Sequence, residues 1–297
     1  MTKIKENIIF FITIFFILFL LLASIFLYLN SEKLKVEKDN LRIISLSPSI
    51  TEFIYDIGLN KYLVANTTFC NYPDDAKNKL KIGTFSDVNY EYIASLKINT
   101  VILESHMEKQ KEIFEKMGYK VIVVKNNTIN DILNTYDTLG KAFHMEDITN
   151  KKKQNIIDKI NNIKSNIKNN NKNISAVISI YRDYSSNVKS LTVVGGNNIY
   201  SDILEILNIN NPFNKYAPYT NISVEALIKS NPDIIFDMYH GENSQNIEKQ
   251  WELLPIKAVN NNHIIVLSDT YLTLPGPRIY LILEEFAKQV QKVMIND

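Results

Sequence analysis

The chain has 297 residues, a formal net charge of +1, and 45% hydrophobic residues. A chain of this length suggests about two domains. The near-zero charge and the lack of a basic run interleaved with aromatics argue against a nucleic-acid partner. The single cysteine, Cys70, excludes an internal disulfide, and one Cys with four His excludes a structural zinc cluster.

The N-terminus carries an uncharged, apolar run of 22 residues at positions 8–29. A membrane-spanning helix needs ~20 apolar residues, whereas the apolar part of a cleaved signal peptide has ~7–15 and ends in a small-residue cleavage site. Neither a clear cleavage pattern nor a lipid-accepting cysteine directly follows the run. The pattern favours a signal anchor at residues 1–30, with a cleaved signal peptide as the alternative, and a polar linker at 31–40.

Residues 41–146 alternate β-rich runs with helical patterns, which predicts an N-terminal α/β lobe. Ser47 and Pro48 are suited to begin a helix, with Glu52 near its positive end, and Gly58 is suited to end it. Strands that alternate with helices favour a parallel sheet covered on both faces. We expect strands at 42–46, 61–67, 100–105 and 119–125, and further helices from residue 89 or 90, at 108–117 and at 128–143.

Residues 147–171 are predicted to form one long helix between the lobes. Isoleucines at 148, 156, 157, 160, 163 and 167 form a stripe among Lys, Asn and Asp. Disorder is the alternative for so polar a segment, but the regular stripe favours a helix of ~35 Å. The α/β pattern then resumes over 172–297, with strands expected at 174–181, 190–196, 233–238 and 263–269, and helices at 199–207, from 225, at 246–254 and at 280–294. The predicted fold is therefore two α/β lobes with parallel sheets, joined by a long rigid helix.

One helix-then-strand phrase occurs in both lobes. Residues 88–103 read VNYEYIASLKINTVIL, and residues 222–236 read ISVEALIKSNPDIIF. Glu91 and Glu225 occupy the same place in the phrase, and each is followed 15 residues later by a histidine, His106 or His240. We expect the two copies to form the same structural unit.

The candidate ligand-binding residues follow the predicted strands. Ligands of open α/β sheets collect outside the carboxyl ends of the strands. The residues there are mostly aromatic, which suits a large, flat, partly apolar ligand, although each could instead pack in the core or on the surface. They are Phe69, Phe85, His106, Tyr181, Arg182, Tyr219, Tyr239, His240, Tyr271 and Arg278.

Metal and catalytic chemistry receive little support from the sequence. His106 and His240 could face each other and ligate a metal that the ligand carries, or be two polar loop histidines. With Glu104 they make only a weak site for a free metal ion. The sequence has no Ser/His/Asp set, no H-E-x-x-H and no convincing carboxylate pair. We therefore expect a protein that is not an enzyme, without catalytic residues, a resident metal or a cofactor.

Several motifs resemble the periplasmic binding proteins of ABC importers for cobalamin, iron-siderophores and haem, and the spacing is closest to the cobalamin branch. They are SPSITEFIYDIG, FCNYPDDAKNKLKIGTFSDVNYEYIASLKINTVIL, ISVEALIKSNPDIIF, WELLPIKAVNNNHIIVL and PGPR, from Arg42 to the C-terminus. The resemblance implies two α/β lobes joined by one long helix. It also implies an extracytoplasmic protein, tethered by its N-terminal helix or periplasmic if that helix is cleaved. Such a protein binds a corrinoid between the lobes, so that any Co or Fe belongs to the ligand, and delivers it to a membrane permease and its ATPase.

The resemblance gives the two glutamates a role. Glu91 and Glu225 match the positions that dock onto permease arginines, although a glutamate there also favours a helix N-terminus. Ligand contacts are implied near Phe69, Phe85, Tyr181, Tyr219 and Tyr271. Phe85 and Tyr219 replace tryptophans common in the branch, and the two histidines are not part of its pattern. Haem or a ferric siderophore is the alternative ligand, and a membrane-anchored sensor that needs no permease is the alternative function.

Overall fold

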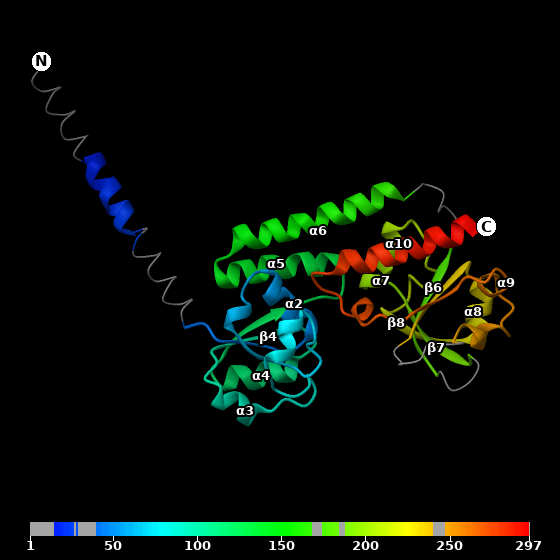
Figure 1. The fold of residues 1–297 in the computed structure, drawn as a ribbon, viewed down its shortest axis with the longest axis horizontal. Helices are drawn as coiled ribbons and strands as arrows, with labels where there is room; N and C mark the ends of the chain where they lie inside the picture. The colour runs from blue at the N-terminus through cyan, green and yellow to red at the C-terminus, as the bar shows by residue number, and fades with distance from the viewer. Residues whose placement is uncertain are drawn as a thin grey trace, which may run out of the picture.

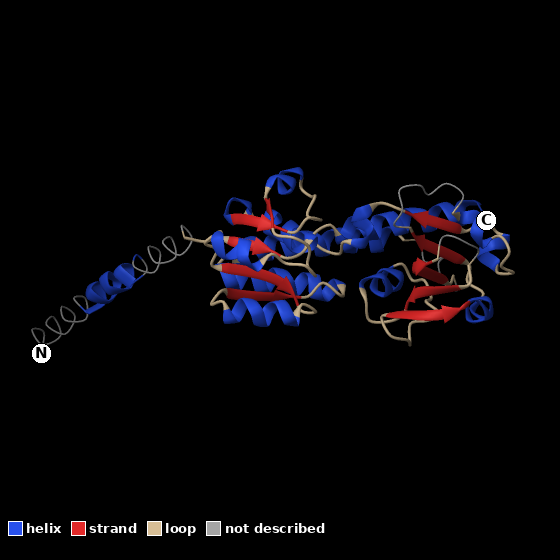
Figure 2. Ribbon diagram, turned by 90° about the horizontal axis from the view of Figure 1, so that it is seen from below, coloured by secondary structure: helices blue, strands red, loops and turns tan. Residues whose placement is uncertain are grey.

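The structure is a computed structural model that describes residues 15–26, 28, 40–167, 174–183, 188–239 and 247–296. Two α/β lobes follow one another along the long axis of the molecule, and helices join them on one side (Figure 1). Each lobe contains its own five-stranded sheet, and the two sheets are separate (Figure 2). The predicted arrangement of two α/β lobes is therefore confirmed.

The N-terminal lobe has a sheet in the order β3-β2-β1-β4-β5, in which every neighbouring pair is parallel, as predicted. Ser47 caps the first helix by accepting a hydrogen bond from the Ile50 amide at 3.3 Å, and Pro48 follows at the first helical position. The strands are β1 Ile43–Ser45, β2 Leu63–Asn66, β3 Leu80–Lys81, β4 Thr100–Glu104 and β5 Lys120–Val124. The helices are α2 Pro48–Asp56, α3 Tyr90–Ser95, α4 Glu108–Lys116 and α5 Ile129–Phe143, with 3-10 turns η1 Asn60–Tyr62 and η2 Asp74–Asn78.

The C-terminal lobe has a mixed sheet in the order β10-β9-β6-β7-β8. Strands β10, β9 and β6 are parallel, whereas β7 is antiparallel to both β6 and β8. The prediction of a parallel sheet is wrong for this edge, because the connection from β6 to β7 is shorter than the dozen or so residues that a parallel crossover needs. The strands are β6 Ala176–Arg182, β7 Ser190–Val194, β8 Tyr219–Ser223, β9 Ile234–Met238 and β10 Ile264–Leu267.

The described residues of this lobe also form the helices α7 Ile199–Ile206, α8 Val224–Ser230, α9 Lys257–Asn260 and α10 Ile279–Asn296. Strand β8 was not predicted from the sequence, which placed Tyr219 in a loop before α8. The helix predicted at 246–254 is also wrong. Its described part is a short 3-10 turn, η4 Glu248–Trp251, and a second such turn, η5 Thr270–Thr273, follows β10.

The repeated phrase folds alike in both lobes. Helix α3 and strand β4 correspond residue for residue to the start of α8 and to β9. The helix caps also correspond: Asn89 accepts from the Tyr92 amide at 2.9 Å, and Ser223 accepts from the Ala226 amide at 3.3 Å. The expectation of one structural unit present twice is confirmed down to the capping residues.

Helix α6, Glu146–Asn166, extends from the N-terminal lobe to the C-terminal lobe (Figure 1). Its 21 residues give a length of ~32 Å. It packs against both α5 and α10, so three helices form the junction between the lobes. Ile156 and Ile160 are buried as the stripe predicted, but Ile148 is 44% exposed. The predicted end of the helix, at 168–171, lies outside the described residues.

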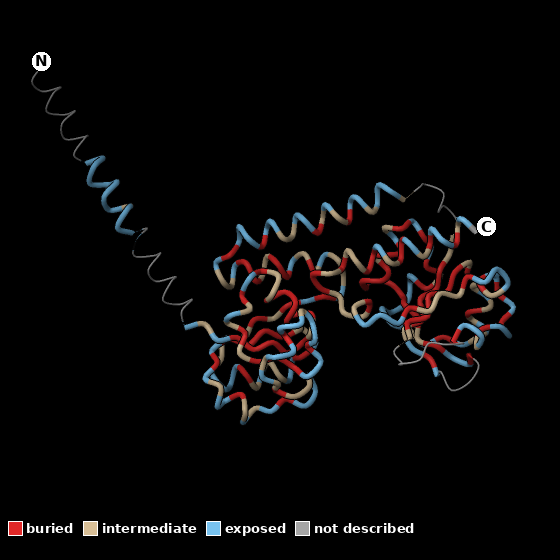
Figure 3. The backbone as a smooth tube through the Cα atoms, viewed as in Figure 1, coloured by how far each residue is buried: buried red, intermediate tan, exposed pale blue. Residues whose placement is uncertain are grey.

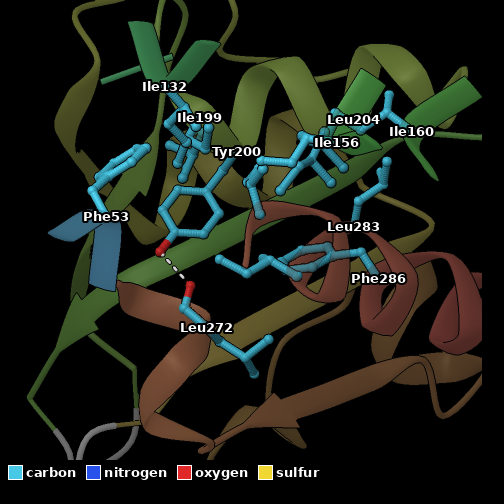
Figure 4. Close-up of a cluster of buried hydrophobic side chains, with 14 of the residues drawn as sticks. Phe53, Ile132, Ile156, Ile160, Ile199, Tyr200, Leu204, Leu272, Leu283 and Phe286 are labelled. Carbon is cyan, nitrogen blue, oxygen red and sulfur yellow. Dashed lines mark hydrogen bonds between the residues drawn. The ribbon is translucent and has the colours of Figure 1, made fainter. Parts of the chain in front are cut away.

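A single cluster of buried apolar side chains runs through both lobes. It includes Phe53 of α2, Ile156 of α6, Tyr200 of α7 and Phe286 of α10 (Figure 4). The Tyr200 hydroxyl donates to the Leu272 carbonyl at 2.9 Å within this cluster. The buried segments of both lobes meet under the linking helices, whose outer surface is exposed (Figure 3). Because packed interiors resist deformation, this shared core restrains motion of one lobe against the other.

Residues 15–26 are helical and lie apart from both lobes (Figure 1). Their large apolar side chains are exposed; Phe15 is 72% and Phe26 is 64% accessible. Among the described residues, none of the helices combines the length and the apolar character that a bilayer span requires. The other residues of the predicted anchor, 1–14, 27, 29 and 30, lie outside the described part of the chain, as do linker residues 31–39.

Candidate ligand-binding surface

Three predicted site residues lie at one edge of the N-terminal sheet. Phe69 follows β2, Phe85 follows β3 and His106 follows β4. The carboxyl ends of parallel strands share one edge of a sheet, so these loops are neighbours. Phe69 is 58% and Phe85 is 49% exposed. The exposed His106 places its Nδ1 3.6 Å from Oε2 of Glu104.

A partly buried lysine fixes the loop that carries Phe69. The ammonium of Lys81 donates to the side-chain oxygen of Asn66 at 2.8 Å and to the carbonyls of Cys70 and Ala76, both at 3.2 Å. Burial lowers the pKa of Lys81. These bonds join both ends of the loop to β3, so Phe69 projects from a pre-organised segment.

Two predicted tyrosines of the C-terminal lobe share one face of its sheet. Tyr181 pairs with Thr192 and Tyr219 pairs with Val194, two residues further along β7. Paired residues share a face, and alternate residues return to it. Tyr181 is 64% and Tyr219 is 50% exposed. Between them the Thr192 hydroxyl donates to the side-chain oxygen of Asn221 at 2.6 Å, so the face combines aromatic rings with an amide.

The loop before Tyr219 is held against a pair of glycines. The Gly196 amide donates to the Tyr216 carbonyl at 3.2 Å, and the buried side chain of Asn198 donates to the Pro218 carbonyl at 2.9 Å. A Cβ at Gly196 would lie 2.1 Å from the carbonyl oxygen of Asn214, so only glycine allows this approach. Tyr216, which is 56% exposed, is an aromatic that sequence reasoning missed; its place just before Pro218 and Tyr219 was the available signal.

Tyr239 and Tyr271 follow β9 and β10, and both are partly exposed. The Tyr239 amide donates to the Leu267 carbonyl at 2.8 Å, which continues the pairing of the two strands beyond their ends. His240 lies outside the described residues, so the idea that it faces His106 stays a prediction.

Arg182 does not lie with the exposed aromatics. Its side chain is fully buried and donates to the carboxylate of Asp237 through Nε at 3.0 Å and Nη2 at 2.8 Å. The indole of Trp251 donates to the same carboxylate at 2.9 Å, and the guanidinium lies 5.0 Å from the indole ring. Arg182 therefore belongs to a buried polar network within the C-terminal lobe. Tyr181 and Arg182 point to opposite faces, as successive strand residues do.

Arg278 joins the two lobes. It precedes α10 and donates to both carboxylate oxygens of Glu52 in α2, with Nε 2.8 Å from Oε2. Its guanidinium lies 3.9 Å from the ring of Tyr72 and 5.7 Å from the ring of Tyr271. Burial raises the pKa of Glu52, and the hydrogen bonds and charge of Arg278 oppose this shift. The sequence placed Glu52 only at a helix N-terminus and gave no sign of this partner.

A pocket of about 380 Å³ opens beside this pair, lined by α2, α6 and the segment before α10. It contains Tyr72 and Arg278, but not Phe69, Phe85, Tyr181 or Tyr219. Within the described part of the chain, no group of three or more His, Cys, Asp or Glu residues is arranged to hold a metal ion.

Glu91 and Glu225 are both exposed, each in the first turn of its helix and each in a different lobe. The pKa of Glu225 is lowered by a hydrogen bond from the Ser223 hydroxyl and by its own backbone amide, so its carboxylate is charged at neutral pH. Each lobe thus presents one exposed glutamate in the first turn of a helix that has a polar cap.

Comparison with known proteins extends these observations. The family model described as "Periplasmic binding protein" matches residues 43–271. A vitamin B12-binding protein of Vibrio parahaemolyticus is 24% identical over 255 residues, which cover 85% of this chain and 90% of the relative. An uncharacterised ABC transporter substrate-binding lipoprotein of Bacillus subtilis is 25% identical over 268 residues, which cover 88% of this chain and 83% of the relative.

Two solved structures from Vibrio cholerae share the fold. The periplasmic vitamin B12-binding protein has a TM-score of 0.71 at 20% identity, and the match covers 85% of this chain and 97% of that one. The periplasmic haem-binding protein also has a TM-score of 0.71, at 19% identity, with 84% and 99% covered. The family match, the two lobes and the linking helix agree: the chain belongs to the periplasmic binding protein family, whose substrate-binding proteins are non-enzymatic solute carriers.

Proposed function

We propose that the protein is the extracytoplasmic solute-binding component of an ABC importer and that it carries a corrinoid between its lobes. The observation that supports this most directly is the set of exposed aromatic side chains on both lobes, Phe69 and Phe85 on one and Tyr181 and Tyr219 on the other. Relatives and a structural neighbour named for vitamin B12 binding favour a corrinoid as the ligand.

The chemistry of these surfaces fits a large, flat ligand. An aromatic side chain buries roughly 150–250 Å² when covered, so four rings supply most of a binding surface without formal charge. The amide of Asn221 and the hydroxyl of Thr192 lie between the tyrosines and can bond to the amide groups at the edge of a corrin ring. The pre-organised loop of Phe69 and the glycine-packed loop of Tyr219 lower the entropy cost of binding.

Haem is the second candidate, and His106 is the observation that favours it. The imidazole is exposed at the aromatic edge of the N-terminal sheet, and histidine is a common axial ligand of haem iron. A haem-binding protein is also among the structural neighbours. A ferric siderophore is the remaining alternative of the same class.

Glu91 and Glu225 are proposed to dock onto arginines of the permease. One exposed ion pair contributes only ~0.2–1 kcal/mol, so a single glutamate would add little affinity. Two such charges, one on each lobe, fix the orientation of the protein on its partner. A membrane-anchored sensor without a permease would not need this pair.

The apolar run at residues 8–29 is proposed to tether the protein to the cytoplasmic membrane. Its described part, residues 15–26, is helical and exposes its large apolar side chains. A lipoprotein among the relatives would reach the same location through a lipid.

Ligand titration tests the proposal. The full chain in detergent micelles is titrated with cyanocobalamin, haemin and a ferrichrome-type chelate, followed by absorbance and by tyrosine fluorescence. We expect one equivalent of cyanocobalamin to bind more tightly than ~10 μM, which corresponds to about −7 kcal/mol. Tighter binding of haemin, with a Soret band that His106→Ala shifts, would instead support the haem alternative. Binding of none of the three would contradict the proposal.

Docking is tested separately by charge reversal. Glu91→Lys together with Glu225→Lys should abolish uptake in cells and leave ligand affinity unchanged. A matched control reverses two other exposed glutamates, Glu112 in the N-terminal lobe and Glu252 in the C-terminal lobe. Normal uptake by the Glu91/Glu225 variant would rule out the docking role.

A further inference from the structure

The buried pair between Glu52 and Arg278 lies between the two lobes. The Glu52 side chain is 2% exposed and that of Arg278 is 16% exposed. Glu52 belongs to α2 of the N-terminal lobe, whereas Arg278 directly precedes α10. Helix α10 packs on the C-terminal lobe, where the ring centroids of Phe286 in α10 and Phe236 in β9 are 4.7 Å apart. The two residues are 226 positions apart in the sequence, so only the folded arrangement of the lobes brings them together.

The guanidinium also contacts one aromatic ring from each lobe. Tyr72, 3.9 Å away, belongs to the N-terminal segment that carries Phe69. Tyr271, 5.7 Å away, belongs to η5 of the C-terminal lobe. A planar cation can hold two carboxylate oxygens in its plane and aromatic rings over its faces at the same time, which an ammonium cannot do.

Two neighbouring contacts restrain the same junction. A Cβ at Gly276 would stand 3.5 Å from Cβ of Ser49, so the segment before Arg278 packs closely on the start of α2. Asp202 of α7 accepts a hydrogen bond at 2.8 Å from the Ile129 amide, at the start of α5 in the other lobe. The Glu52–Arg278 pair is therefore one of several contacts that join segments of the two lobes.

Stability alone does not account for this arrangement. Buried ion pairs are often no more stabilising than apolar residues of the same volume, because both charges lose their hydration. The Glu52–Arg278 pair differs from an apolar contact because its interactions depend on orientation. Its two hydrogen bonds and two ring contacts can all form only in one position of α2 relative to η5.

We propose that Arg278 is a positioning residue of the ligand site, which holds the aromatic segments of the two lobes at a fixed separation and does not itself contact the ligand. This inference rests on the proposed function, because it assigns Arg278 to the same site. It differs from the expectation that Arg278 binds the ligand directly, since the side chain is engaged with Glu52, Tyr72 and Tyr271.

The separation of the lobes can be measured without a ligand. Spin labels at Lys116→Cys in α4 and Lys229→Cys in α8, both exposed positions, report the distance between the lobes by pulsed electron paramagnetic resonance in the full chain. The native Cys70 is buried, and the chain without the added cysteines controls for its labelling.

Glu52→Leu with Arg278→Met removes both charges at similar volume, so that neither partner remains buried alone. Arg278→Lys keeps the charge and loses the planar fork, and it serves if the double variant fails to fold.

We expect both changes to broaden the distance distribution relative to the parent chain and to weaken cyanocobalamin binding by at least tenfold. A matched control, Arg182→Met with Asp237→Leu, removes a buried pair within the C-terminal lobe and should leave the distribution unchanged. Distributions as narrow as that of the parent would overturn the inference. A parent chain that binds no cyanocobalamin would count against the proposed function, and the distance measurement would still decide the role of Arg278.

Discussion

Replacing Arg182 by methionine tests whether this residue belongs to the core of the C-terminal lobe or to the ligand site. In the structure both Arg182 and Asp237 have fully buried side chains. Removing the arginine leaves the Asp237 carboxylate buried without its cation. Breaking a buried pair in this way costs about 3–5 kcal/mol. Because Trp251 still donates to the carboxylate, we expect a loss near the lower end, ~3 kcal/mol.

The single tryptophan of the chain provides the assay. Trp251 is fully buried against this network, so its fluorescence reports unfolding of the C-terminal lobe. With a urea dependence of ~2 kcal/mol/M, a loss of ~3 kcal/mol lowers the unfolding midpoint by ~1.5 M. Asp237→Leu added to Arg182→Met should recover at least half of the loss, because no lone charge remains buried.

The opposite result would refute this reasoning. If Arg182 instead contacted the ligand from the surface, Arg182→Met would reduce ligand affinity and shift the midpoint by less than ~0.5 M, equivalent to ~1 kcal/mol.

Two further changes test individual contacts. For Asp233, burial raises the pKa, but hydrogen bonds from Ser175 and the ammonium of Lys257 outweigh it and hold the pKa below its ordinary value of 3.8. Asp233 therefore contributes stability above that pH and loses it as the pH falls through the lowered pKa. Asp233→Asn should melt at a lower temperature than the parent at pH 7, with the gap closing at pH values below the lowered pKa; a gap independent of pH would contradict the assignment. Gly196→Ala should destabilise the chain by ~1–3 kcal/mol, because its Cβ meets the backbone of Asn214. Gly276→Ala, whose Cβ would make an ordinary contact, is the control, and equal unfolding midpoints for the two variants would show that the close approach is unimportant.

Local patterns in the sequence were sufficient to predict most of the elements. The repeated phrase predicted two equivalent helix–strand units, and the structure reproduces them with equivalent caps at Asn89 and Ser223. Helix α6 was predicted from its isoleucine stripe because a helix that covers a core on one side has a fixed periodicity. The mixed sheet was harder to predict, because the direction of β7 depends on a short connection and not on the pattern of either strand.

The candidate site was predicted less completely, because its contacts join distant parts of the chain. Tyr181 and Arg182 follow one another at the end of a predicted strand, so the sequence assigned both to the ligand site. Strand alternation turns Arg182 into the core and Tyr181 toward solvent. The pairing of Glu52 with Arg278 depends on how the two lobes pack. No local signal distinguishes such a pair from a helix-terminal glutamate and a loop arginine.

The proposed binding mode places the ligand between aromatic residues of the two lobes. Equilibrium titration of cyanocobalamin into Phe85→Ala, Tyr219→Ala and the double variant tests it most directly, because each residue lies on a different lobe and is about half exposed. Ile295→Ala, which removes an exposed apolar side chain near the end of α10, is the control. We predict that each single change weakens binding at least tenfold, the double change more than either, and the control not at all. Unchanged affinity in the double variant would contradict the account.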